Sequence, residues 1–149
     1  MPGGHNHYRD KGFSRGYVTG GSNAAKKIRE LGEDVLKAAK AALADGAELI
    51  VEDAKSRCPV SNSKYLSHRG LSAGELRDSI KAEPKKSGTI YKISANAQDN
   101  KGFYYGQVVE FSPRVNHPFL YPAMDANRAA VHDKIVAAIQ QACQTKQGK

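Results

Sequence analysis

The sequence has few cysteines, few aromatic residues and no long apolar run. It contains no Trp and only two Cys among 149 residues, and its aromatic content is 7%. No apolar stretch approaches the about 18–20 residues of a membrane span, so we expect no contact with a membrane. Residues 1–21 lack the apolar stretch of a secretory signal. Cys58 and Cys143 cannot form a disulfide framework, which indicates a reduced, intracellular setting and leaves a single disulfide as the disfavoured alternative.

Motifs of catalysis and cofactor binding are also missing. The chain has no phosphate-binding GxxxxGK[ST], no GxGxxG after a strand and no HExxH. We therefore expect no enzymatic activity, no cofactor and no metal. His5 and His7 form an HxH pair without a third ligand nearby, which favours a solvated tail. His117 and His132 are conceivable general bases, but neither has a recognisable nucleophile beside it.

The chain is basic, and its charge is unevenly distributed. It has 23 Lys and Arg against 15 Asp and Glu, a net charge of +8. Half of this charge lies in residues 1–31, which carry six basic and two acidic side chains. A second group contains Lys81, Lys85, Lys86 and Lys92. Such groups are compatible with contacts to DNA or acidic proteins and also with a solvated face. We mark the four lysines as candidates for a surface that faces DNA.

The composition predicts one domain flanked by two polar segments. Its hydrophobic content of 40% and charged content of 26% are typical of a globular chain. Residues 1–22 contain six glycines and only isolated apolar residues, which predicts an extended arm with a reach of roughly 70 Å. We expect a single α+β domain at residues 23–143 and a frayed polar tail at residues 144–149.

Three helices are expected. Residues 23–31 predict a short helix, and residues 33–57 predict a long helix with one apolar face that ends before Pro59. A second apolar stripe predicts a helix over residues 122–142. Cys58 follows the first long helix, where the helix dipole disfavours a thiolate, so we interpret it as a small buried apolar residue.

Three strands are expected between the two long helices. Residues 76–82, 89–95 and 103–111 alternate apolar and polar side chains, and the short connectors contain Pro, Gly and Asn, which predicts an antiparallel meander. The serine-rich residues 60–73 predict a long loop. The expected architecture is α+β, with a long N-terminal helix and a C-terminal helix packed on one face of a 3–4-stranded antiparallel sheet.

Three segments, taken in order, resemble a known family. They are residues 54–60 (AKSRCPV) followed by 74–80 (GELRDSI), residues 104–111 (YYGQVVEF) and residues 118–125 (PFLYPAMD). Together they resemble the minor tail component, or neck, proteins of long-tailed bacteriophages, over roughly residues 28–142. The chain departs from the family pattern in its inserted residues 61–73 and in Tyr121, where the family usually has arginine.

The resemblance implies a structural virion protein of the head–tail junction, made in the host cytoplasm and assembled with its own copies into a ring, six-fold to match the tail tube. The implied partners are connector or head-closure proteins, tail-terminator or tail-tube proteins, and the packaged DNA. The side chains that we expect at contacts with partners are Arg9, Phe13, Tyr17, Tyr65, Leu66, Arg77, Glu110, Phe119 and Tyr121. For the residues of the three segments, core packing and chain turning remain equally good interpretations.

Two details stay open at this level. The Glu110 carboxylate is expected to pair either with an arginine or with backbone donors. Asp78 is expected to pair with Arg77 of a neighbouring subunit, to pair with a lysine, or to mark a solvated sheet edge. The alternative function is a small nucleic-acid-binding protein that uses residues 1–31 and 81–92, although the chain lacks a groove-reading helix and a platform of exposed aromatics.

Overall fold

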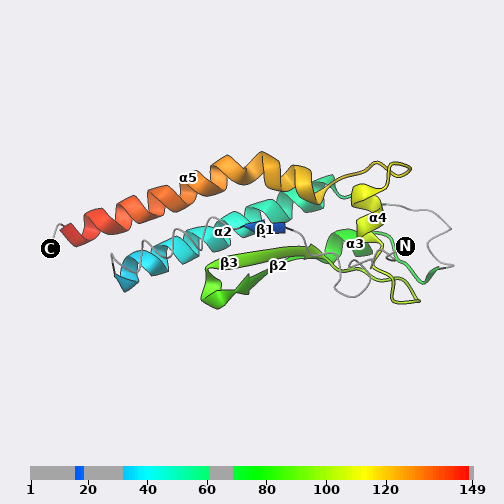
Figure 1. The fold of residues 1–149 in the computed structure, drawn as a ribbon, viewed down its shortest axis with the longest axis horizontal. Helices are drawn as coiled ribbons and strands as arrows, with labels where there is room; N and C mark the ends of the chain where they lie inside the picture. Colours follow the sequence, from blue (N-terminus) through cyan, green and yellow to red (C-terminus); the bar gives the residue numbers. More distant parts are fainter. Residues whose placement is uncertain (1–15, 19–31, 61–68, 148–149) are drawn as a thin grey trace, which may run out of the picture.

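The computed structural model describes residues 16–18, 32–60 and 69–147. The elements are β1 (Gly16–Val18), α2 (Glu33–Arg57), α3 (Glu75–Asp78), β2 (Ile80–Lys85), the 3-10 turn η2 (Lys86–Gly88), β3 (Ile90–Ala95), α4 (Gly106–Phe111) and α5 (Leu120–Gln147). These helices and strands confirm the expected α+β class (Figure 1). No described helix is both long enough and apolar enough to cross a bilayer.

Several expectations fall outside the described residues. They are the short helix at residues 23–31, most of the arm, the HxH pair, and the contact residues Arg9, Phe13, Tyr65 and Leu66. Tyr17 is described only through the backbone of β1.

The long helix α2 has the bounds that the sequence predicts. It begins after Gly32, whose φ of 107° suits glycine, and Glu33 and Asp34 lie in its first turn, where carboxylates favour the helix dipole. It ends at Arg57, two residues before Pro59. Its nine buried residues cover about half of the helix circumference at 100° per residue, more than one packing partner needs. Figure 1 shows why: α2 lies between α5 and the hairpin of β2 and β3.

Helices α2 and α5 run antiparallel in close contact. The start of α2 meets the end of α5, because Val35 packs with Ile139 and Cys143. Halfway along, Gly46 faces Val131, and a Cβ built on Gly46 would lie only 2.7 Å from the Val131 Cγ1. The absence of a side chain at Gly46 therefore lets the two helices approach. Val131 and Ile135, both in the apolar stripe that the sequence predicts, are buried.

Helix α5 is longer than predicted at both ends. It begins at Leu120 rather than Pro122, because the N–H groups of its first turn have acceptors in α4, as described below. It continues to Gln147, so the expected frayed tail is helical as far as that residue. Thr145 donates its hydroxyl to the Gln141 carbonyl at 2.9 Å, which supports the last turns. α5 packs along α2 and contacts the sheet through β1, whereas α2 contacts β2 and β3.

Strands β2 and β3 form an antiparallel hairpin with Ile80 opposite Ala95 and Ala82 opposite Ile93. Ile80, Ile93 and Ala95 are fully buried in the core that also includes α2. The three-residue strand β1, from the segment predicted to be the arm, pairs antiparallel with the other edge of β3, which gives the order β1-β3-β2.

The strand predicted at residues 76–82 is wrong over its first half. Residues 75–78 form α3, and β2 begins only at Ile80. The cause is local: the Ser72 N–H donates to the Glu75 carboxylate at 2.9 Å, and the Glu75 N–H donates to the Ser72 carbonyl at 3.2 Å. These two hydrogen bonds close a turn over residues 72–75, and α3 follows from Gly74, whose φ of 82° suits glycine.

The strand predicted at residues 103–111 is also wrong, because residues 106–111 form α4. Glycine at 106 allows α4 to sit against the hairpin, since a Cβ there would lie 3.1 Å from Leu76 and 3.2 Å from the Ala95 carbonyl. Of the three segments predicted as strands, only two form strands, β2 and β3, and the short third strand of the sheet is β1 from the predicted arm.

Candidate interaction surface

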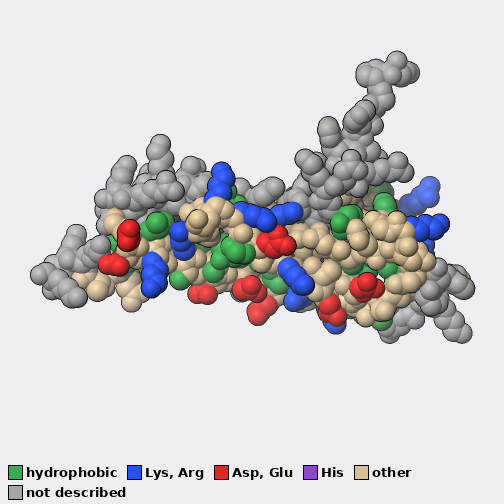
Figure 2. All heavy atoms as spheres, turned by 90° about the horizontal axis from the view of Figure 1, so that it is seen from below, with side chains coloured by type: hydrophobic (Ala, Val, Ile, Leu, Met, Phe, Trp, Pro, Cys, Tyr) green, Lys and Arg blue, Asp and Glu red, His purple; other side chains and the backbone are tan. Residues whose placement is uncertain are grey.

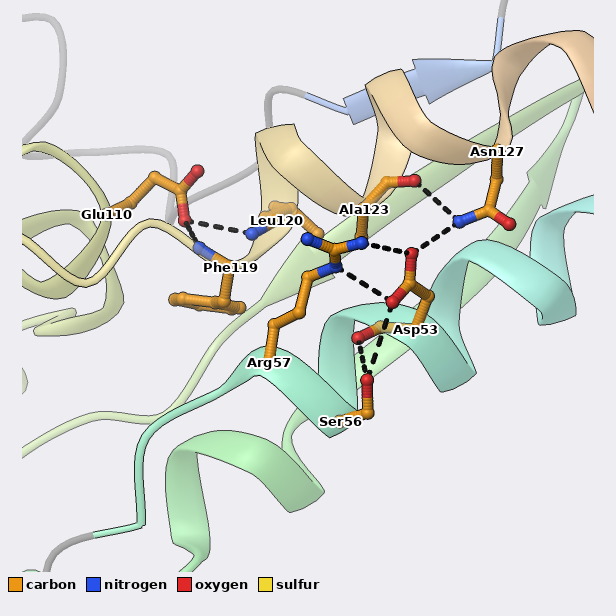
Figure 3. A network of polar contacts seen from close by, with 8 residues as sticks. All are labelled: Asp53, Ser56, Arg57, Glu110, Phe119, Leu120, Ala123 and Asn127. Atoms are coloured by element: carbon orange, nitrogen blue, oxygen red, sulfur yellow. Dashed lines mark hydrogen bonds and ion pairs between the residues drawn. The ribbon is translucent and has the colours of Figure 1, made fainter.

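The buried Glu110 of α4 caps helix α5. Its carboxylate accepts hydrogen bonds from the backbone N–H groups of Phe119 at 2.7 Å, Leu120 at 2.9 Å and Tyr121 at 2.9 Å, the first two of which appear in Figure 3. The first N–H groups of a helix have no partner within the helix, and a carboxylate also suits the positive end of the helix dipole. Of the two alternatives for Glu110, the backbone donors are therefore the partners.

Phe119 lies beside this cap and is completely buried. Glu110 and Phe119, two of the expected contact residues, are thus taken up inside the chain. Their effect on any partner is indirect, because they fix the corner between α4 and α5. Tyr121, by contrast, is only half-buried. The centroid of its ring lies 5.5 Å from that of the Phe111 ring, and the two ring planes are tilted by 60°.

A second polar network joins the same corner to α2 (Figure 3). Asp53 pairs with Arg57 at 2.8 Å, one turn along α2. Asn127 of α5 donates to the Asp53 carboxylate at 2.6 Å and to the Ala123 carbonyl at 2.8 Å. The hydrogen bond from Arg57 holds the pKa of Asp53 below its ordinary value, against a smaller opposing effect of burial. The end of α2 and the first turns of α5 are therefore held together.

Large exposed apolar side chains gather around this corner. The five in the described residues are Val60, Phe103, Val108, Phe111 and Val115. Phe111 is 52% exposed, and it lies one turn from Val108, which is 40% exposed, on α4. All five belong to α4, its flanking loops or the end of α2, at one end of the elongated molecule (Figure 1). We call Phe103, Val108, Phe111 and Val115 the α4 apolar surface, and such patches are typical of sites where proteins meet.

Phe103, Val108 and Phe111 are not among the contact residues expected from the sequence. Interpreted as a strand, residues 103–111 place Phe103 and Phe111 on the packed face of a sheet. The helix instead turns Phe111 and Val108 outward together. The unusual density of aromatic and branched residues in this short segment was the available signal.

The expected contact residue Arg77 is exposed and pairs with its own neighbour. Its guanidinium lies 3.0 Å from the Asp78 carboxylate, and the two side chains are 44% and 68% exposed. Within the single chain, Asp78 thus pairs with its own neighbour Arg77.

The structure brings the four candidate lysines together on the hairpin. Strand alternation puts Lys81 and Lys85 on the face of β2 away from buried Ile80. Lys92 shares that face, opposite Glu83, and Lys86 follows in the turn. Glu83 also lies 3.1 Å from the Lys85 ammonium, so one carboxylate sits amid these hairpin lysines. Figure 2, which looks toward the hairpin, shows acidic and basic side chains on the same side of the molecule.

The two thiols and two of the histidines have ordinary structural positions. Cys58 is buried as expected, and burial raises the pKa of its thiol to about 11. Cys143 is free at the opposite end of α2, against Val35, so the single disulfide is not formed. His117 is exposed, and exposed His132 lies 3.2 Å from Asp133. No three His, Cys, Asp or Glu of the described ranges are placed to share a metal ion.

These features define a small α+β subunit with an apolar end, which suits contact with other proteins. Residues 22–111, more than half of the chain, match the family described as "Bacteriophage HK97-gp10, putative tail-component", and the chain belongs to this family of phage tail components. The match includes the segments at residues 54–60, 74–80 and 104–111, whereas residues 118–125 lie beyond it. Neither the curated proteins nor the solved structures compared with the chain match it.

Membership of the family gives the protein a structural role in the tail of a bacteriophage and therefore a place in the virion. The resemblance found in the sequence is confirmed at this level. The partners of a tail component are other structural proteins of the phage particle.

Proposed function

We propose that the protein is a subunit of the head–tail junction, or neck, which assembles with copies of itself into a ring that joins the connector to the tail. The observation that carries the proposal is the α4 apolar surface in a member of a tail-component family. A chain that leaves such side chains in water is stabilised by a partner that covers them. The ring has six subunits, to match a six-fold tail tube.

In this role the protein acts through burial between chains and performs no bond-making chemistry. A ring of one chain uses a head-to-tail contact, in which two different surfaces of the subunit meet. The corner fixed by Glu110 and Asp53 presents one of them. Residues 1–15, with Arg9 and Phe13, together with Tyr17 of β1 and with Tyr65 and Leu66 of the loop, reach adjacent subunits or adjacent rings.

The test is the mass of the native assembly. We expect full-length protein to give a discrete hexamer in native mass spectrometry and analytical ultracentrifugation. The double variant Val108→Ser, Phe111→Ser is expected to be monomeric with unchanged circular dichroism, whereas Ala41→Ser, on the exposed side of α2, is expected to assemble normally. Wild-type protein that stays monomeric, both alone and with purified head and tail proteins, would contradict the proposal.

A truncation tests the arm. Removal of residues 1–15 keeps β1 and its pairing with β3. We expect the truncated protein to fold and melt like wild type but to leave heads without attached tails in an assembly reaction. Normal particles from the truncated protein would show that the arm has no part in joining.

A nucleic-acid-binding protein is the second candidate function, because the hairpin lysines share one region of the surface. Phosphate contacts would make binding steeply salt-dependent, with log K falling by about 0.9 per contact against log salt. Retention of wild type on DNA with such a slope, lost in Lys81→Ala, Lys92→Ala, would favour it. Against it stands the balance of charge: residues 32–60 and 69–147 contain 15 Lys and Arg and 13 Asp and Glu.

A further inference from the structure

Helix α2 carries a row of carboxylates along its solvent side. Residues 41–54 contain four acidic and no basic residues. Asp45, Glu48 and Glu52 are spaced by three and four positions, which places them on one face, and all three are exposed. We call these three residues the acidic stripe.

The acidic stripe differs from the other carboxylates of the chain. Asp53 pairs with Arg57, Asp78 with Arg77, Glu83 with Lys85 and Asp125 with Arg128. Within the described part of the chain, no basic side chain is ion-paired to Asp45, Glu48 or Glu52. Like charges at these helical spacings repel one another, so the stripe is unfavourable in the isolated subunit. A basic surface that covers it would remove this repulsion.

The hairpin lysines provide a surface of opposite charge and similar length. Lys81, Lys85, Lys86 and Lys92 surround a single carboxylate, that of Glu83. From Lys81 to Lys85 the strand rises about 13 Å, and from Asp45 to Glu52 the helix rises about 10 Å. The two rows of charge therefore match in extent.

These two surfaces cannot meet within one chain. The inner face of the hairpin, with Ile80 and Ile93, packs toward α2, so the lysines on its outer face point away from α2. The acidic stripe lies on the part of α2 that neither the hairpin nor α5 covers. Contact between the surfaces therefore requires two copies.

We propose that the acidic stripe of one copy docks on the hairpin lysines of the next copy. The contact joins two different surfaces of the same chain and is therefore head-to-tail, as a ring requires. It rests on the proposed function, because it names the surfaces by which the ring subunits meet. Charge complementarity of this kind sets orientation and partner choice, while apolar burial supplies most of the affinity.

Charge reversal in the full-length chain tests the contact. The acid-reversed variant carries Glu48→Lys and Glu52→Lys, and the base-reversed variant carries Lys81→Glu and Lys92→Glu. Glu48, Glu52 and Lys81 are exposed and Lys92 is half-buried, and unchanged circular dichroism and Tm confirm the fold of each variant. We expect each variant alone to associate at least about tenfold more weakly than wild type, because both of its surfaces then carry the same sign.

The decisive experiment mixes the two variants. The stripe of the acid-reversed variant, now positive, faces the hairpin of the base-reversed variant, now negative. The unchanged acidic stripe of the base-reversed variant faces the unchanged lysines of the acid-reversed variant. We expect the mixture to recover oligomers that contain the two variants in a 1:1 ratio by native mass spectrometry. A control with Asp125→Lys and Asp133→Lys changes the net charge equally on α5 and is expected to assemble like wild type.

Each other outcome overturns the inference. If wild type and both variants form the same oligomer, the ring is held by other surfaces and only the docking contact fails. If wild type is monomeric, the proposed function fails with it. If the mixture does not recover and only the base-reversed variant loses retention on DNA, the lysines bind DNA. If deletion of residues 1–15, which keeps β1, abolishes the effect of acid reversal, the stripe binds that segment instead.

Discussion

The Glu110 carboxylate accepts a hydrogen bond from the backbone N–H of Phe119 at 2.7 Å, although α4 and α5 are separate helices. A loop of eight residues, 112–119, connects them, and this bond with its two companions fixes where the loop ends. The helix that packs along α2 therefore starts from a point set by a side chain of another element.

Glu110→Ala is expected to lower the free energy of unfolding by about 2–3 kcal/mol, because three N–H groups lose a charged acceptor in a buried place. Glu110→Gln keeps one acceptor oxygen, so we expect a smaller loss of about 1 kcal/mol. Urea unfolding followed by circular dichroism measures both. Glu33→Gln, an exposed control, is expected to stay within about 0.5 kcal/mol of wild type. Equal stability of Glu110→Ala and wild type would show that the Glu110 cap does not stabilise the fold.

Gly46→Ala tests the approach of α2 and α5. Alanine favours a helix by about 1 kcal/mol over glycine, but here its Cβ collides with Val131, and such overpacking costs about 1–3 kcal/mol. We expect a net loss of stability in wild type. In a Val131→Ala background both Cγ contacts are removed and only the Cβ contact at 3.3 Å remains, so the same change is expected to cost much less stability. A double-mutant cycle by thermal unfolding measures the coupling, and additive effects would contradict the contact.

The Asp53 network predicts that the free energy of unfolding depends on pH in the acid range. Arg57 lowers the folded-state pKa of Asp53 below 3.8, so its contribution is complete above the unfolded-state pKa and is lost as pH falls through the folded value. We expect wild type to exceed Asp53→Asn in stability by less than about 1 kcal/mol at pH 7, because the pair is partly exposed. Unfolding in urea from pH 7 to pH 2 should show this difference begin to shrink near pH 4 and disappear as the carboxylate becomes protonated in the folded state. A constant difference across that range would be the contrary result.

The two thiols are expected to react at different rates. Burial raises the pKa of Cys58 to about 11 from 9.0, which lowers its thiolate fraction at pH 8 by about 100-fold. Alkylation of native protein with iodoacetamide at pH 8 should therefore modify Cys143 and leave Cys58 intact until the chain is unfolded. Mass spectrometry of the Cys143→Ser variant supplies the control, since this variant should take up almost no label. Rapid labelling of Cys58 would show that the end of α2 opens readily.

The sequence was sufficient where a pattern repeats over many turns or where a residue has a strong local preference. The bounds of α2 followed from its helix-forming residues and from Pro59, and the burial of Cys58 followed from its place at the end of that helix. The family also followed from short segments whose order and spacing, rather than any single residue, are distinctive.

The sequence was insufficient where the conformation of a short segment depends on distant groups. Residues 103–111 alternate well enough for a strand, and only the fit of Gly106 against Leu76 and the reach of Glu110 to α5 make part of this segment a helix. The same error concealed the α4 apolar surface, because a strand and a helix turn Val108 and Phe111 in different directions.

By itself, the sequence determined that two long helices form, because an apolar stripe repeated over six or more turns can be buried in only one way. It also determined that the chain is basic and where the lysines lie along it. Tertiary structure alone decided that Glu110 faces inward, that Phe111 faces outward and that the hairpin lysines and the acidic stripe lie on separate surfaces. Each of these depends on contacts between residues far apart in the chain, which no local pattern records.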